Sequence, residues 1–154
     1  MVNEKLLELQ NKIKVKFKNI NLLKQSLIHK SFDNKNNNEK LEFLGDRVLG
    51  LVLSKILLKI YSHEKEGMID KKFANLVNKK TCAEISGKLN LKKFMLLGDS
   101  CKEDKKSNEK ITSDALEALI GAIFLDKNLK ESEKFIINNW QKYIEKSDFT
   151  KIDS

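Results

Sequence analysis

Four carboxylates stand within two apolar segments of this sequence, in a pattern that could bind a metal ion. Glu42 and Asp46 are four residues apart in one segment, and Asp114 and Glu117 are three apart in the other. If both segments are helical, each pair lies on one face of its helix. A carboxylate beside a core must be paired, hydrogen-bonded or bound to a cation, because its desolvation otherwise costs several kcal/mol. Two such helices that met would form a four-carboxylate metal site.

The alternative for either pair is a solvated surface, which is the common situation of acids on helices, and the residues alone leave both possibilities open. Two basic residues are near in sequence, Arg47 and Lys110, and we expect both to point to other faces or to lie outside the site. The apolar residues around Glu42 and Asp46 are expected to lie in the core: Leu41, Phe43, Leu44, Val48 and Leu49. If the carboxylates bind metal, an all-oxygen ligand set predicts a hard ion, Mg²⁺ or Mn²⁺.

Glycines occur inside both acid-bearing segments, at Gly45 and Gly50 in the first and at Gly121 in the second. A glycine in a helix interior costs about 1 kcal/mol relative to alanine. Close approach of another backbone would compensate for this cost. The glycines therefore fit two helices packed tightly enough to bring their acids together, although glycines that are merely tolerated are the alternative.

The composition bounds the class of protein. The chain has 154 residues, of which 40% are hydrophobic and 34% charged, as is typical of one soluble globular domain. No apolar run approaches the roughly 20 residues of a membrane span, and the N-terminal residues lack the apolar stretch of a secretory signal. Two cysteines without CxxC spacing argue against a disulfide framework or a zinc site. We therefore expect a cytoplasmic protein that makes no membrane contact.

The net charge of +8 favours a polyanionic partner. All but one of the 30 basic residues are lysine, and Arg47 is the exception. An AT-rich genome would produce the same lysine-rich usage, so the charge alone does not identify the partner. Lysine makes point-charge contacts to phosphate, so binding is expected to depend more on backbone and shape than on base sequence.

The absence of proline and the long segments of 3.6-residue apolar periodicity predict an all-α fold. One long helix should be central, with Leu51 and Ile60 among its apolar residues, and Trp140 should lie in the core. Residues 101–109 are expected to form a charged, mobile loop. The expected helices span residues 3–14, 20–28, 39–61, 67–77, 79–89, 110–126 and 129–145, with a short helix or turn over 91–97.

Residues 38–46, which read N-E-K-L-E-F-L-G-D, resemble the signature of the ribonuclease III family. Residues 113–126 resemble the second signature of that family. Shorter matches occur at residues 29–32, 66–67 and 76–78. The resemblance predicts a ribonuclease III endonuclease domain, a bundle of helices, over residues 1–146, and the start of a linker or tail over 147–154.

The resemblance implies a homodimer that hydrolyses double-stranded RNA with Mg²⁺, for which Mn²⁺ can substitute. The expected products carry 5′-phosphate and 3′-hydroxyl ends, and the expected role is processing of ribosomal and messenger RNA. By motif position, the metal ligands are Glu42, Asp46, Asp114 and Glu117. Asp46 and Glu117 are expected to matter most for catalysis. No small-molecule cofactor is implied.

Glu39 and Glu66 fall at two further acidic positions of the family. The resemblance implies that they support the cleft and the dimer, although each could also be an exposed residue at a helix end. A catalytically inactive domain that binds double-stranded RNA or the ribosome is the alternative function. Such forms usually lose one or more of the four acids, and this chain retains all four.

The chain departs from the pattern of the family in three places. Phe73 stands where a basic residue is usual, so either Lys71 or Lys72 replaces its contacts or Phe73 only repacks. The segment before the second signature lacks the usual Gly-Gly pair. Bacterial members continue into a double-stranded-RNA-binding domain, so we expect either an isolated catalytic domain or a natural short form.

Overall fold

Helices make up nearly all of the regular structure in residues 2–148, which are the residues that the computed structural model describes. Those residues contain no strand, only an isolated bridge between Ile28 and Leu96. The helices are α1 (Val2–Ile13), α2 (Ile20–Ser26), α3 (Glu39–Ile60), α4 (Glu66–Val77), α5 (Lys79–Leu89), the 3₁₀ helix η1 (Leu91–Phe94), α6 (Lys105–Asp126) and α7 (Leu129–Lys146). The expected all-α fold is confirmed. The expected tail begins at residue 147, so most of it lies outside the described residues.

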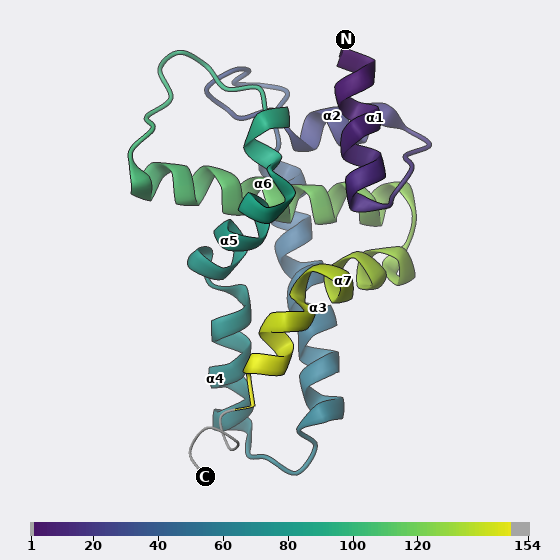
Figure 1. Ribbon diagram of the computed structural model, residues 1–154, viewed down its shortest axis with the longest axis vertical. Helices are drawn as coiled ribbons and strands as arrows, with labels where there is room; N and C mark the ends of the chain where they lie inside the picture. Colours follow the sequence, from purple (N-terminus) through teal and green to yellow (C-terminus); the bar gives the residue numbers. More distant parts are fainter. Residues whose placement is uncertain (1, 149–154) are drawn as a thin grey trace.

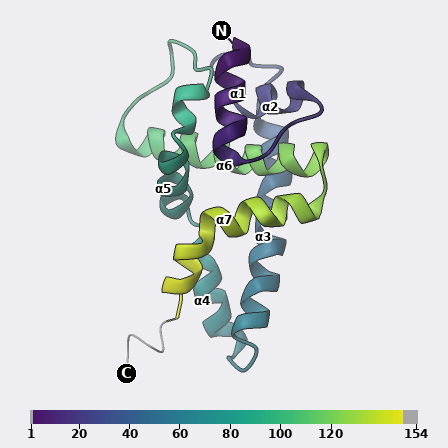
Figure 2. The same cartoon turned by 45° about the vertical axis from the view of Figure 1, so that its right-hand side comes forward.

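The arrangement is organised around α3 and α6, which make the most extensive contact between any two helices. Figures 1 and 2 show α6 running across the first half of α3, while α4 runs beside the second half. Helices α2, α5 and α7 also pack on α6. No helix in this part of the chain is both long and apolar enough to cross a membrane.

The core lies between α3, α6 and α7. Leu49 and Leu53 of α3 and Leu116 and Ile120 of α6 are fully buried. Trp140 of α7 is also fully buried, and its indole N–H donates a 2.9 Å hydrogen bond to the carbonyl of Leu76. The prediction that Trp140 lies in the core is therefore confirmed.

Part of the apolar surface of α3 lies outside this core. The prediction that Phe43 lies in the core is wrong, because this residue is 61% exposed. Leu51 and Ile60 of the same helix are 59% and 52% exposed. The helix is apolar on more than one side, and α6, α4 and α7 cover only some of them. An apolar strip, which consists of Phe43, Leu51 and Leu58, therefore remains open along one face of α3.

The start of α6 differs from the prediction by five residues. The helix begins at Lys105, because the carboxylate of Asp104 accepts a hydrogen bond from the backbone N–H of Ser107 and caps the first turn. The added turn consists of polar residues, so it carries no apolar periodicity from which a helix could be predicted. Residues 101–109 are therefore half loop and half helix.

Lys72 is buried and cannot replace a basic residue at the surface. Its ammonium lies 2.6 Å from a carboxylate oxygen of Glu64 and 3.4 Å from the centre of the Tyr61 ring. The neighbouring Phe73 is half-buried, and its ring packs towards Gly50 of α3. Lys72 therefore cannot make such contacts, whereas Lys71 is exposed, and replacement of the contacts by Lys71 stays a prediction.

The end of α6 is tied to the chain that precedes α2. The carboxylate of Asp126 accepts hydrogen bonds of 2.9 and 2.8 Å from the backbone N–H groups of Lys18 and Asn19. Desolvation alone would raise the pKa of Asp126, but these two bonds and the nearby Lys127 ammonium together lower it. The last residue of the second signature is thus a structural anchor for the helix that carries Asp114 and Glu117.

Candidate metal centre

Helices α3 and α6 meet backbone to backbone at Gly45 and Gly121. A Cβ atom on Gly45 would overlap the carbonyl group of Glu117, and one on Gly121 would overlap the carbonyl group of Leu41. The expectation of close backbone approach is confirmed for these two glycines. It is wrong for Gly50, because a Cβ atom there would have only a side-chain atom as its nearest neighbour, Cζ of Phe73 at 3.6 Å. The short distance between the helices lets acids on α3 reach acids on α6.

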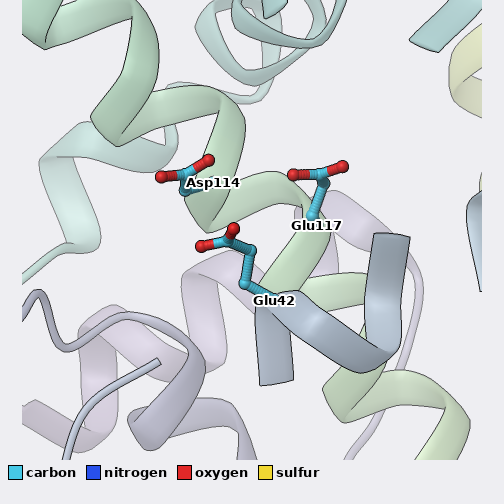
Figure 3. Close-up of side chains that lie close together, drawn as sticks. All are labelled: Glu42, Asp114 and Glu117. Atoms are coloured by element: carbon cyan, nitrogen blue, oxygen red, sulfur yellow. The ribbon is translucent and has the colours of Figure 1, made fainter. Parts of the chain in front are cut away.

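Three of the four predicted acids converge at this crossing. One carboxylate oxygen each from Glu42, Asp114 and Glu117 lies within 4.8 Å of the others. Figure 3 shows Glu42 rising from α3 towards Asp114 and Glu117, which project from successive turns of α6. All three side chains are half-buried. Three carboxylate oxygens so close together could hold one hard divalent cation.

The fourth predicted acid, Asp46, lies at the margin of this group. It stands one turn after Glu42 on α3, and its side chain is 57% exposed. It lines the same cavity as Glu42 and Glu117, and the Glu117 side chain hydrogen-bonds to it. Asp46 therefore lies on the solvent-exposed side of the carboxylate group.

The electrostatics of the centre fit a cation. Burial, a hydrogen bond to Asp46 and the negative charges of Asp46, Asp114 and Glu42 raise the pKa of Glu117 to about 9. Burial and the charge of Asp114 also raise the pKa of Glu42. Crowded carboxylates repel one another when ionised, and a divalent cation would relieve that repulsion. The oxygen donors and their shared negative charge thus suit Mg²⁺ or Mn²⁺.

Lys110 contacts the centre, contrary to the expectation that it points elsewhere. Its ammonium lies 2.8 Å from Oδ2 of Asp114, one helical turn later on α6. The spacing of four residues was the sequence signal for this contact, since side chains at i and i+4 are neighbours on a helix. Arg47 is nearer than expected too, because its guanidinium lies 3.7 Å from Oδ2 of Asp46. It also stacks on the Phe43 ring.

Two cavities open on either side of the carboxylates. One has a volume of about 540 Å³ and includes Arg47 and Lys79 in its lining. The other has a volume of about 440 Å³ and includes Lys30 and Lys102. The side chains that line both cavities are Glu42, Lys110 and Asp114. The centre therefore lies between two hollows whose walls carry basic groups.

The two further acids lie in different places. Glu39 is exposed at the first residue of α3 and lines the 440 Å³ cavity. Glu66 is exposed at the first residue of α4. Figure 1 shows that the connection between α3 and α4 is at the opposite end of α3 from the crossing with α6. The structure thus brings Glu39, but not Glu66, to the margin of the centre.

Comparison with known proteins gives a consistent set of relatives. Residues 19–144 match the model of a family described as ribonuclease-III-like. The chain is 52% identical over 148 residues to Ribonuclease 3 of Pelagibacter ubique, covering 96% of this chain and 67% of the relative. It is 43% identical over 138 residues to Ribonuclease 3 of Campylobacter fetus, covering 88% and 61%. The chain thus spans about three fifths to two thirds of the length of these relatives.

A solved structure shares the fold. The nuclease domain of ribonuclease III from Campylobacter jejuni superposes with a TM-score of 0.80 at 39% identity, and the match covers 91% of this chain and 96% of that one. The family match begins just before α2, ends within the last turn of α7 and includes every acid of the centre. The chain belongs to the ribonuclease III family.

Proposed function

We propose that this domain is a metal-dependent endonuclease that hydrolyses double-stranded RNA and leaves 5′-phosphate and 3′-hydroxyl ends. The observation that carries the proposal is the convergence of Glu42, Asp114 and Glu117 where α3 crosses α6. Relatives named Ribonuclease 3 support the class of substrate. Processing of ribosomal and messenger RNA in the cytoplasm is part of the same proposal.

In this proposal Glu42, Asp46, Asp114 and Glu117 hold Mg²⁺, for which Mn²⁺ can substitute. When bound, the ion supplies Lewis acidity, which makes a water molecule nucleophilic near neutral pH and balances charge on the phosphate. Glu117 contributes a half-buried carboxylate that must lose its proton before it can act as a ligand. Asp46, which is more exposed, would contribute its carboxylate to the ion from the open side. Loss of either side chain should therefore reduce the rate most.

The basic groups beside the centre would hold the RNA backbone. Lys30 and Lys102 line one cavity, and Arg47 and Lys79 line the other. Phosphates that approach the carboxylates would meet cations on both sides. Such contacts follow the shape and charge of a duplex and not its base sequence, and their strength falls steeply as salt is added.

We also propose that the domain acts as a homodimer through the open strip of α3. The strip contains Phe43, Leu51 and Leu58, whose side chains are each about 60% exposed and share one face of the helix. In the Campylobacter jejuni domain a region is involved in dimer formation. A two-fold dimer would carry two carboxylate centres. Glu66 stands near the exposed Met68 at the start of α4, so its position favours a dimer contact, whereas Glu39 would support the cleft.

The substrate class can be tested by comparative digestion. The protein is incubated at low salt with an RNA duplex of perfect complementarity, with each separated strand, and with a DNA duplex of the same sequence. We expect cleavage of the RNA duplex alone, in Mg²⁺ and not in EDTA. The 5′ ends of the products should accept a labelled phosphate only after their own 5′-phosphate has been removed. Equal cleavage of the single strands, or cleavage in EDTA, would overturn the proposal.

A further inference from the structure

Lys110 belongs to α6 and lies where the two cavities meet. It lines both of them, together with Glu42 and Asp114. Its ammonium donates to Oδ2 of Asp114 at 2.8 Å. The Asp114 side chain is only 18% exposed, whereas the Lys110 side chain is 56% exposed. The ammonium of an exposed lysine thus contacts one of the more enclosed carboxylates of the centre.

We propose that Lys110 is a resident counter-charge of the carboxylate centre, which a divalent cation must displace from Asp114, and that it thereby sets the metal concentration at which the centre fills. The inference rests on the proposed metal site. It adds a residue that regulates the site from outside the set of ligands.

The charges around Lys110 support this role. Its ammonium lies 2.8 Å from Oδ2 of Asp114, and a carboxylate oxygen of Asp114 lies within 4.8 Å of one oxygen each from Glu42 and Glu117. All three members of the close carboxylate group therefore attract the same ammonium. An ion bound between those three oxygens would lie within a few ångströms of the ammonium and would repel it. Occupation of the centre and the contact between Lys110 and Asp114 therefore oppose each other.

The geometry also allows Lys110 to leave. More than half of its side chain is exposed, and it faces a cavity on either side of its present position. An ion pair between residues four apart on a helix contributes little to stability when one partner is as exposed as Lys110. Removal of the lysine should therefore leave the fold intact and change mainly the electrostatics of the centre.

The test is calorimetric titration of Mn²⁺ into the metal-free protein without RNA. Lys110→Met should bind Mn²⁺ about tenfold more tightly than the wild type, because a repelling charge at close range has been removed. Lys110→Arg keeps the charge and should bind more weakly than Lys110→Met. The matched control is Lys106→Met, which removes the same charge one turn earlier on α6, outside both cavities. It should bind Mn²⁺ within about twofold of the wild type, as expected for a more distant exposed charge.

The Mg²⁺ concentration that gives half-maximal cleavage should fall by a similar factor in Lys110→Met. A Kd for Lys110→Met that equals or exceeds that of the wild type would overturn the inference while leaving the proposed metal site in place. An equal gain in Lys106→Met would overturn it as well, since the effect would then be one of net charge. A folded wild type that binds no Mn²⁺ would overturn the proposed function, and the inference with it.

Discussion

The backbones of Gly45 and Gly121 are in contact where α3 crosses α6, and neither position has room for a Cβ atom. Glu42 lies three residues before Gly45, and Glu117 four residues before Gly121. The two glycines therefore set the distance between the helices and, with it, the separation of the carboxylates. The metal site that we propose therefore depends on a contact between backbones, in which no carboxylate group takes part.

Gly45→Ala should separate the helices. The added methyl group would collide with the carbonyl of Glu117, which is held in α6 and cannot move freely. We expect the free energy of unfolding in urea to fall by about 3 kcal/mol and Mn²⁺ binding to weaken. The matched control is Gly87→Ala in α5, where a Cβ meets no atom within 4 Å. That change should stabilise the protein by about 0.5–1 kcal/mol through helix propensity. Equal stability of the two variants would contradict this role for Gly45.

The metal-free protein should lose stability as the pH rises. The pKa of Glu117 is 4.5 in its ordinary state and about 9 in the fold, chiefly because the carboxyl is buried. The folded state therefore binds this proton more tightly than the unfolded state. The free energy of unfolding in EDTA should thus decrease between about pH 5 and pH 9. Solvent at the open cavities screens the charge, so we expect a loss on the order of 2 kcal/mol.

Glu117→Gln provides the control for this prediction, because an amide does not titrate. Urea unfolding of the variant at pH 5, 7 and 9 in EDTA should show a smaller decrease than the wild type. The shift of Glu42 has the same direction, so some of the slope should remain. An identical slope in both proteins would show that Glu117 does not hold its proton in the fold.

Leu51→Lys should dissociate the proposed dimer. A charge in the middle of the apolar strip of α3 would have to be buried without a partner in a two-fold interface. Sedimentation should show a dimer for the wild type and a monomer for the variant at the same micromolar concentration. Leu7→Lys is the control, because Leu7 is 52% exposed on α1, a different helix. The strip would not be the interface if Leu51→Lys sedimented as the wild type does.

Much of the centre could be predicted from the sequence, for a physical reason. Acids and glycines inside apolar helices raise the free energy of the fold unless another helix lies close to them. The sequence therefore indicated a close helix crossing, and the structure contains one at Gly45 and Gly121. Burial was harder to predict, because α3 is apolar on more than one side and the sequence does not say which sides neighbours cover. Phe43 was therefore wrongly expected in the core.

The contact of Lys110 with Asp114 was missed for a related reason. The spacing of the two residues allows an ion pair, but whether a flexible lysine turns towards a cluster of acids depends on acids from another helix. Glu42 of α3 supplies part of that attraction. Such a contact follows from the tertiary arrangement, and the sequence around Lys110 alone does not determine it.

The most direct test of the account is cleavage of a long RNA duplex at low salt with Mg²⁺ by the wild type, Glu117→Gln and Glu145→Gln. Glu145 lies on α7, outside both cavities, and its variant controls for the loss of one carboxylate. We predict cleavage by the wild type and Glu145→Gln, and a rate about a hundredfold or more lower for Glu117→Gln, with duplex affinity in Ca²⁺ largely retained. Cleavage by Glu117→Gln at the rate of the wild type would contradict the assignment of the carboxylates at the crossing of α3 and α6 as the active centre.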